Sequence, residues 1–178
     1  MIRTLLIAAI LLLAACAGTS PRSVGDSPEL RLSPASLGRE LVLQQQLTFT
    51  IGGEQRSMEA LLEVDANGVA LAVQAAGQSA LVLRWDGERL QEQRAAWLPP
   101  QVRGERVLND LQLSYWPAQA IRAVLPDGWT LEEDRDVRRL REHGVDVATV
   151  RFVSPDRIEI ESHRDGVRLT IVSSQVSP

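Results

Sequence analysis

Between residues 41 and 94, apolar and polar side chains alternate in short runs that end in turn-forming residues. In the first run, 41–51, five of the six odd positions are apolar, against one of the five even positions. A period of two places every second side chain on the same face of a strand. Gly52-Gly53 and Asn67-Gly68 favour tight reversals between such runs. The alternation therefore predicts an antiparallel meander of four or five strands and argues against repeated β–α units.

The alternation stops at Trp97-Leu98-Pro99-Pro100, and a helical spacing replaces it. Apolar residues recur every three or four positions over residues 104–116. Pro117 cannot continue that helix, but proline suits the first turn of a second helix, which must stop at Pro126. The sequence predicts two short helices with a bend at Trp116-Pro117. The loop 97–100 either folds onto the mouth of the sheet or reaches outward to a membrane or a partner.

The segment 129–143 fits two structures. Its early acidic residues, its later basic residues and the following Gly144 are typical of an isolated helix. Its spaced apolar residues also fit the two arms of a hairpin, which we favour because further strands follow. A hairpin turn at Asp165-Gly166 separates the last two of them. The predicted strands lie at 147–153, 158–160 and 167–171.

The first 15 residues have the pattern of a secretory signal peptide. One positive charge, Arg3, precedes nine consecutive apolar residues, 5–13, whereas a membrane-spanning helix needs ~20. The run ends in Leu13-Ala14-Ala15-Cys16, which resembles a bacterial lipobox. The resemblance implies cleavage before Cys16 and lipid attachment to its thiol. Each buried methylene contributes ~0.8 kcal/mol, so two or three acyl chains would anchor the protein stably in a membrane.

Ala17 follows the cysteine, where an aspartate would signal retention in the inner membrane. By analogy with lipoprotein sorting, we expect a lipid-anchored protein on the periplasmic face of the outer membrane. Residues 16–38 are rich in Gly, Ser and Pro and predict a flexible tether with a reach of roughly 25 Å. A single folded domain is expected at 39–175, and the 163 residues from Cys16 onward suffice for a core.

The counts of reactive residues exclude several chemistries. The chain has one Cys and two His, and all 19 of its basic residues are Arg. Without Lys there is no Schiff-base site and no P-loop lysine, and one Cys cannot form an intramolecular disulfide or a Cys-rich zinc site. Without Arg3, 18 basic and 23 acidic residues leave a net charge of −5. Binding to nucleic acid is therefore not expected.

Three stretches carry a resemblance to a known family: Leu111-Gln112-Leu113-Ser114-Tyr115-Trp116-Pro117, Arg138-Arg139-Leu140 and the closing segment 165–171. Over residues 39–173 the chain resembles small bacterial lipoproteins of unknown function, often encoded beside aryl polyene biosynthesis enzymes and similar to LolA and LolB. The resemblance implies a mainly β fold of class α+β. It would be a curved antiparallel half-barrel, capped by two short helices, with an apolar cavity that accepts acyl chains.

In LolB a protruding loop with an exposed apolar residue assists membrane insertion of lipoproteins. The hairpin tips here, Asn67-Gly68 and Gly77-Gln78-Ser79, are small and polar. This departure argues against lipoprotein insertion and leaves lipid or polyene binding open. Candidate cavity-lining residues are the apolar strand faces and the tryptophan at the helix bend. They are Leu43, Leu47, Phe49, Leu62, Val64, Leu71, Val73, Leu83, Trp85 and Trp116.

Two readings of these residues remain. They line a cavity for a lipid, a lipoprotein acyl chain or an aryl polyene lipid, or they fill an ordinary core in a scaffold lipoprotein that binds a protein partner. We expect no cofactor, metal or catalytic residues, because no hydrolase, nucleotide or metalloprotease motif occurs. The protein is also expected to be a monomer. Glu159, Glu161 and His163 share a predicted strand face, but ~6.8 Å per two residues is long for one ion.

Overall fold

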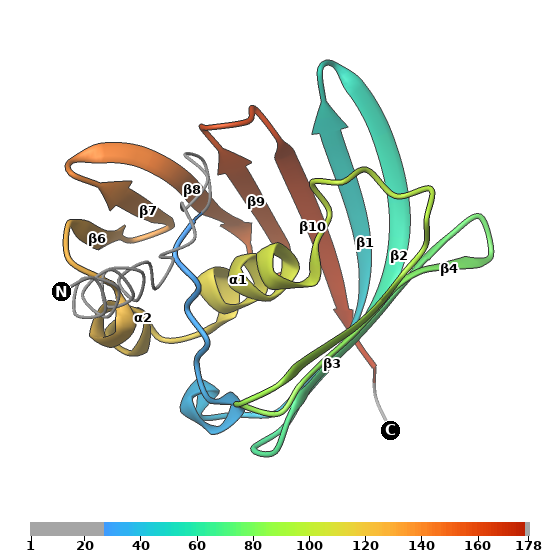
Figure 1. Ribbon diagram of the computed structural model, residues 1–178, viewed down its shortest axis with the longest axis horizontal. Coiled ribbons are helices and arrows are strands. Elements are labelled where there is room, and N and C mark those ends of the chain that lie inside the picture. Colours follow the sequence, from blue (N-terminus) through green and yellow to red (C-terminus); the bar gives the residue numbers. More distant parts are fainter. Residues whose placement is uncertain (1–26, 177–178) are drawn as a thin grey trace, which may run out of the picture.

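The computed structural model describes residues 27–176, which form one curved, ten-stranded antiparallel sheet with two short α-helices (Figure 1). A 3-10 turn, η1 (Pro34–Leu37), precedes the first strand. Among the described residues no helix is long and apolar enough to cross a membrane. The elements are β1 (Leu41–Ile51), β2 (Glu54–Val64), β3 (Val69–Ala75), β4 (Gln78–Trp85), β5 (Leu90–Arg94), α1 (Gly104–Tyr115), α2 (Ala118–Val124), β6 (Trp129–Asp134), β7 (Val137–Glu142), β8 (Val145–Ser154), β9 (Arg157–Ser162) and β10 (Arg168–Gln175).

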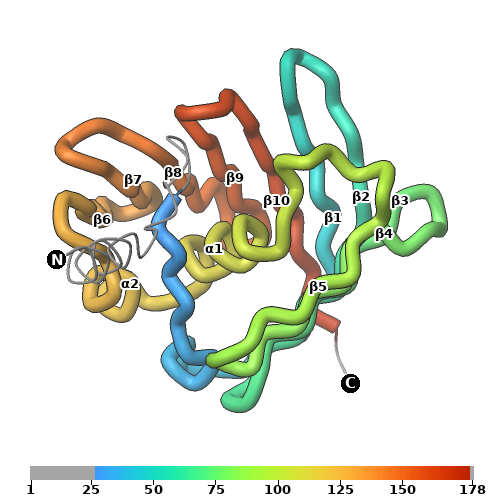
Figure 2. Tube along the Cα trace, in the orientation of Figure 1, coloured from blue at the N-terminus to red at the C-terminus, as the bar shows by residue number. Residues whose placement is uncertain are grey.

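The sheet consists of two meanders that meet in its middle. The strand order is β5-β4-β3-β2-β1-β10-β9-β8-β7-β6, so every neighbour pair is consecutive in sequence except β1 and β10. Those two strands pair in a register that places Leu47 opposite Ile171. We call β1–β5 the first wing and β6–β10 the second wing. The two helices connect β5 to β6, the edge strands of the sheet, and α1 lies in the hollow of its concave side (Figures 1 and 2).

Alternate side chains of each wing point into this hollow. β1 begins with three buried-then-exposed pairs, and β2 ends with the same alternation. The odd positions of β1 and the even positions of β2 therefore form the inner face, as the period of two predicts. The predicted mainly β, antiparallel fold with two short helices is confirmed. The helix bend is also confirmed, since α1 ends one residue before Trp116 and α2 begins one residue after Pro117.

The ambiguous segment 129–143 is the hairpin of β6 and β7, and the helical alternative is wrong. Leu131 lies opposite Leu140, and both side chains are buried. The acidic residues of one arm lie opposite the arginines of the other, so the charge pattern that suits a helix also suits cross-strand pairs. An example is Glu132, which is paired in the sheet with Arg139.

The N-terminal boundary of the domain differs from the prediction. Residues 28–38, expected to belong to the tether, pack against the domain: 28–32 run alongside α1, and Leu30 and Leu32 are each only 4 % exposed. The backbone N–H of Leu30 donates to Asn109 Oδ1 at 3.0 Å, and that of Leu32 donates to Gln112 Oε1 at 3.1 Å. Side-chain amides of a helix thus replace the partners that a strand would offer. The domain begins near residue 28 rather than at 39.

The predicted signal peptide (1–15), the predicted lipid attachment site Cys16 and the first part of the predicted tether lie outside the described residues. For them the predictions stand as made.

Candidate ligand-binding cavity

A small apolar cavity lies between α1 and the inner face of the first wing. Its volume is about 50 Å³, and β10 and the loop 95–103 close its remaining sides. Most of the lining is aliphatic or aromatic, with Gln45 and Asp110 as the polar contributors. The lining residues are Gln45, Leu47, Phe49, Met58, Leu71, Val73, Ala80, Leu81, Leu98, Val102, Val107, Asp110, Leu111, Leu169 and Ile171.

Gln45 places an amide among the apolar side chains of β1. It is 2 % exposed, and its Nε2 donates to Tyr115 Oη at 2.8 Å and to Ser173 Oγ at 3.0 Å. These bonds join β1, α1 and β10, so the amide N–H groups are satisfied despite their burial. Burial also raises the pKa of the Tyr115 phenol above its ordinary value. Tyr115 therefore stays protonated and acts as a neutral hydrogen-bonding group.

Asp110 lies on α1 where the cavity meets solvent, because it lines the cavity while 30 % of its side chain stays exposed. Burial raises its pKa to about 6, and Arg106 only partly offsets this effect. The Arg106 Nε lies 4.0 Å from Asp110 Oδ2, whereas its terminal nitrogens donate to the carboxylate of Asp165 in the β9–β10 turn. Asp165 has a lowered pKa, since the hydrogen bonds and charge of Arg106 outweigh its desolvation.

The loop 95–103 forms a roof over the cavity. Leu98 points inward and is 4 % exposed, whereas its neighbour Trp97 is 48 % exposed. The guanidinium group of Arg94, at the end of β5, donates to the carbonyl oxygens of Leu98 (2.5 Å), Pro99 (2.8 Å) and Val102 (2.8 Å). The roof is therefore fixed to the sheet by one side chain and by the insertion of Leu98. The buried Leu98 agrees with the interpretation that this loop folds onto the mouth of the sheet.

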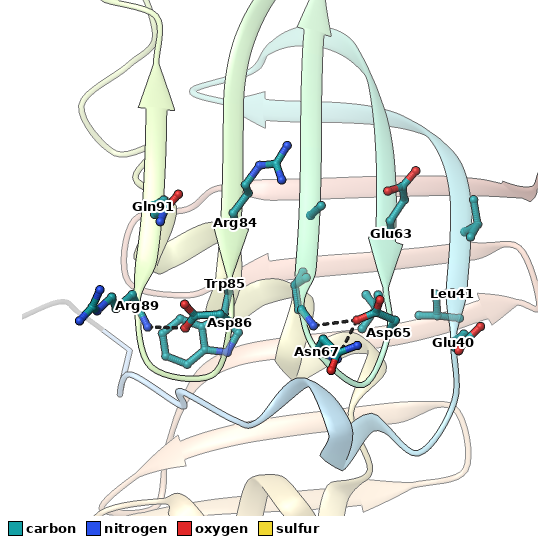
Figure 3. Close-up of a pocket in the computed structure, with 15 residues that line it drawn as sticks. Glu40, Leu41, Glu63, Asp65, Asn67, Arg84, Trp85, Asp86, Arg89 and Gln91 are labelled. Carbon is teal, nitrogen blue, oxygen red and sulfur yellow. Dashed lines mark hydrogen bonds between the residues drawn. The ribbon is translucent and has the colours of Figure 1, made fainter.

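A second depression, of about 550 Å³, lies on the outer face of the first wing near its turns. Figure 3 shows Gln91 of β5 beside Arg84 of β4 on this face, and Glu63 of β2 beyond the intervening strand β3. The Asp65 and Asp86 carboxylates accept backbone N–H groups in the two turns at its edge. Such bonds lower the pKa of Asp86, so this carboxylate stays charged. The polar residues hold the turns, and the depression is open to solvent.

The family model described as "Protein of unknown function (DUF3261)" matches residues 42–175, which include all ten strands and both helices except for Leu41. The chain belongs to the DUF3261 family. No curated protein matches the DUF3261 chain.

Among the solved structures that this DUF3261 protein matches, two show a distant likeness to it. One is a LolA superfamily protein from Nitrosomonas europaea, 11% identical, with a TM-score of 0.44, and the match covers 85% of this chain and 95% of that one. The other is a DUF1329 family protein from Desulfovibrio piger, 7% identical, with a TM-score of 0.39 and coverages of 82% and 88%. These likenesses are distant and extend no function to the DUF3261 protein.

Four of the ten predicted lining residues, Leu47, Phe49, Leu71 and Val73, line the cavity of the DUF3261 protein. The other six are buried elsewhere in its core, with Val64 and Trp85 also at the edge of the outer depression. These six are Leu43, Leu62, Val64, Leu83, Trp85 and Trp116. Pattern alone separates the two groups poorly, because the cavity occupies one end of the inner face and the alternation runs along its full length.

The two buried tryptophans hold the N-terminal segment. Trp85 Nε1 donates to Leu32 O at 2.8 Å, and Trp116 Nε1 donates to Ser33 O at 3.1 Å. Two polar residues of the cavity, Gln45 and Asp110, are absent from the residues predicted from the sequence. A glutamine at the single polar odd position of the first strand was the visible signal for Gln45. Asp110 had none beyond its place in the helix.

His163 does not lie on the face of β9, which ends at Ser162. Its Nε2 is 2.8 Å from Thr149 Oγ1, and Glu159 and Glu161 form ion pairs with arginines. Among residues 27–176, no group of three His, Cys, Asp or Glu side chains is placed to hold a metal ion.

Proposed function

We propose that this DUF3261 protein is a lipid-anchored, monomeric, non-enzymatic carrier that binds one hydrophobic chain between α1 and the first wing. The observation that carries the proposal is an apolar cavity roofed by a loop that one arginine holds in place. The cargo would be a lipid, a lipoprotein acyl chain or an aryl polyene lipid. Burying its hydrocarbon would supply the binding free energy, at about 25 cal/mol per Å².

The cavity must open for this function. At about 50 Å³ it is far below the ~300 Å³ at which small-molecule pockets begin. The loop 95–103 is the element that can enlarge it, because Leu98 and Val102 contribute to the lining and α1 begins only at Gly104. Withdrawal of Leu98 would join its space to the cavity and expose Phe49 and Met58 on the opposite wall.

Placement at the outer membrane follows the expectation from the lipobox and from Ala17. Lipid attached to Cys16 would hold the domain at the periplasmic face, and the domain would exchange cargo with that membrane or with a periplasmic partner. Replacing Cys16 by Ser should abolish acylation and membrane fractionation. A Cys16→Ser protein that remains membrane-bound after carbonate washing would contradict the anchor.

Cargo binding is tested on the mature chain from residue 16, with Cys16→Ser so that no anchor lipid is attached. The protein is purified without detergent, and its organic extract is analysed by mass spectrometry. A stoichiometric acyl or polyene compound supports carriage. The matched variant is Ala80→Phe, which would fill the cavity from β4 and should lose the compound while keeping a cooperative thermal transition. A clean extract together with no binding of fluorescent fatty acids would remove the carrier.

One observation favours a second candidate function. The cavity is small and the remaining inner face is packed, as expected for a scaffold lipoprotein with a filled core. A partner would then bind the outer face of the first wing, where the 550 Å³ depression lies. Arg84→Glu, in that depression, should weaken such a partner's binding and leave chain binding unchanged, whereas Ala80→Phe should do the opposite.

A further inference from the structure

The two polar groups of the cavity differ in how well they are satisfied. Gln45, at the buried end, already donates two hydrogen bonds. For the Asp110 carboxylate, at the solvent end, the nearest cation among residues 27–176 is the Arg106 Nε, 4.0 Å away and beyond hydrogen-bond distance. Arg106 directs its terminal nitrogens to Asp165 instead. Asp110 is therefore the polar group at the mouth with capacity to accept a ligand.

A hydrocarbon tail entering here would cover part of the remaining exposed surface of Asp110. Covering an ionised carboxylate without a partner is unfavourable, whereas a charge-assisted hydrogen bond to it is favourable. A head group that donates hydrogen bonds or carries positive charge removes the penalty. An anionic head would instead meet two carboxylates, Asp110 and Asp165, against the single guanidinium group of Arg106.

We propose that Asp110 selects the head group of the cargo, so that the cavity prefers single-chain amphiphiles with a cationic amine head over those with a carboxylate head. The inference rests on the proposed chain-binding function and specifies its ligand class. The tail lies between α1 and the first wing, and the ammonium group donates to the Asp110 carboxylate at the mouth. A neutral alcohol head binds with intermediate affinity, since it donates one hydrogen bond without charge.

The test compares three ligands of equal tail length on the mature Cys16→Ser chain: dodecylamine, dodecanol and dodecanoate. The affinity of each ligand is measured by its displacement of the neutral dye N-phenyl-1-naphthylamine at neutral pH. Every ligand is kept below its own critical micelle concentration. One charge-assisted hydrogen bond corresponds to about tenfold or more in affinity, so dodecylamine should bind at least about tenfold more tightly than dodecanoate. Equal affinities or the reverse order would overturn the proposal.

Asp110→Asn should bring the amine and carboxylate affinities within about threefold of each other while leaving dodecanol unchanged. Asp134→Asn, at an exposed position of β6, is the matched control and should keep the full preference. If Asp110→Asn lacks a cooperative melt, Asp110→Ser takes its place, and the three-ligand comparison needs no variant at all. A variant that keeps the preference refutes the role of Asp110. Failure of dodecanol and the dye to bind would instead refute the chain-binding function.

Discussion

The two wings have the same number of strands but present different inner faces. In the first wing, side chains from β1 to β4 surround a cavity that α1 does not fill. In the second wing, Arg138 of β7 reaches under the helix, and its Nη1 donates to the carbonyl oxygens of Leu113 (2.9 Å) and Trp116 (2.8 Å). Its guanidinium group also lies 5.1 Å from the Phe152 ring centroid. The second wing fixes the end of α1, and the first wing keeps a space beneath its start.

The outer faces differ as well. Outward positions of β1 in the first wing are the uncharged Gln44, Gln46 and Thr48. Strands β7 to β10 of the second wing carry arginines in ion pairs with acidic neighbours, such as Arg151 with Glu161. Rows of paired charges discourage association with another molecule, whereas uncharged outward positions such as those of β1 permit it. The second wing thus anchors the end of α1, whereas the first wing contains the cavity and the outer depression.

The largest effect should come from Arg138→Leu. Loss of the Arg138 guanidinium group leaves the carbonyl oxygens at the end of α1 without this donor and leaves Glu133 without its ion-pair partner. We expect a loss of about 3 kcal/mol in the free energy of unfolding, measured in urea. The neighbouring Arg139→Leu, on the opposite face of β7, should cost less than about 1 kcal/mol. Equal losses for the two variants would show that α1 is not anchored by the second wing.

A matched pair of alanines tests whether only the first wing has free space. Ala80 lines the cavity, and Ala148 is buried in the second wing away from it. Ala148→Val should destabilise the protein by about 1–3 kcal/mol, as overpacking does. Ala80→Val should change stability by less than about 1 kcal/mol, because its added methyl groups enter existing space. Thermal and urea unfolding of both variants decide, and a larger loss for Ala80→Val would contradict the assignment.

The sequence could predict the features of both wings that depend on local signals, but not those that depend on long-range packing. Alternation and turn residues identified most strands, and Pro117 identified the helix bend, because those signals are local. The pairing of β1 with β10 joins residues over a hundred positions apart, so no local pattern reveals it. The cavity was not predictable residue by residue, since its size depends on how α1 and Leu98 pack. The composition of residues 28–38 alone suggests a tether. The segment packs on the domain because Asn109 and Gln112, far away in the sequence, accept its backbone N–H groups.

The pH dependence of stability tests the mouth of the cavity in the first wing. Asp110 has a pKa of about 6 in the folded protein against 3.8 as the ordinary value. The folded state therefore binds more protons between these values, and stability falls as pH rises through that window. The shift corresponds to at most about 3 kcal/mol, and partial exposure reduces our expectation to about 1–2 kcal/mol. Asp110→Asn should remove this loss.

The measurement is the difference in unfolding free energy between the unmodified protein and Asp110→Asn, in urea, from about pH 4 to about pH 8. The difference should be near zero at the acidic end and should favour the variant at the alkaline end. Taking the difference cancels the groups that change in the opposite direction, such as Glu161, whose pKa its arginine neighbours lower. Parallel pH profiles would show that Asp110 is solvated in the folded protein.

The smallest effect should come from the outer face of the second wing. Arg151 lies 3.3 Å from Glu161, and 47 % of the Arg151 side chain is exposed. Exposed pairs contribute little because solvent and salt screen them, so Arg151→Gln should cost about 0.5 kcal/mol at low salt and less at high salt. It should also raise the pKa of Glu161, since Arg151 is the first cause of its lowered value. Gln93→Ala, at an uncharged position on the outer face of the first wing, should show no salt dependence. A loss above about 2 kcal/mol for Arg151→Gln would mean that the ion pairs act as one network. The outer face of the second wing would then contribute to stability in addition to the hydrogen bonds between Arg138 and α1.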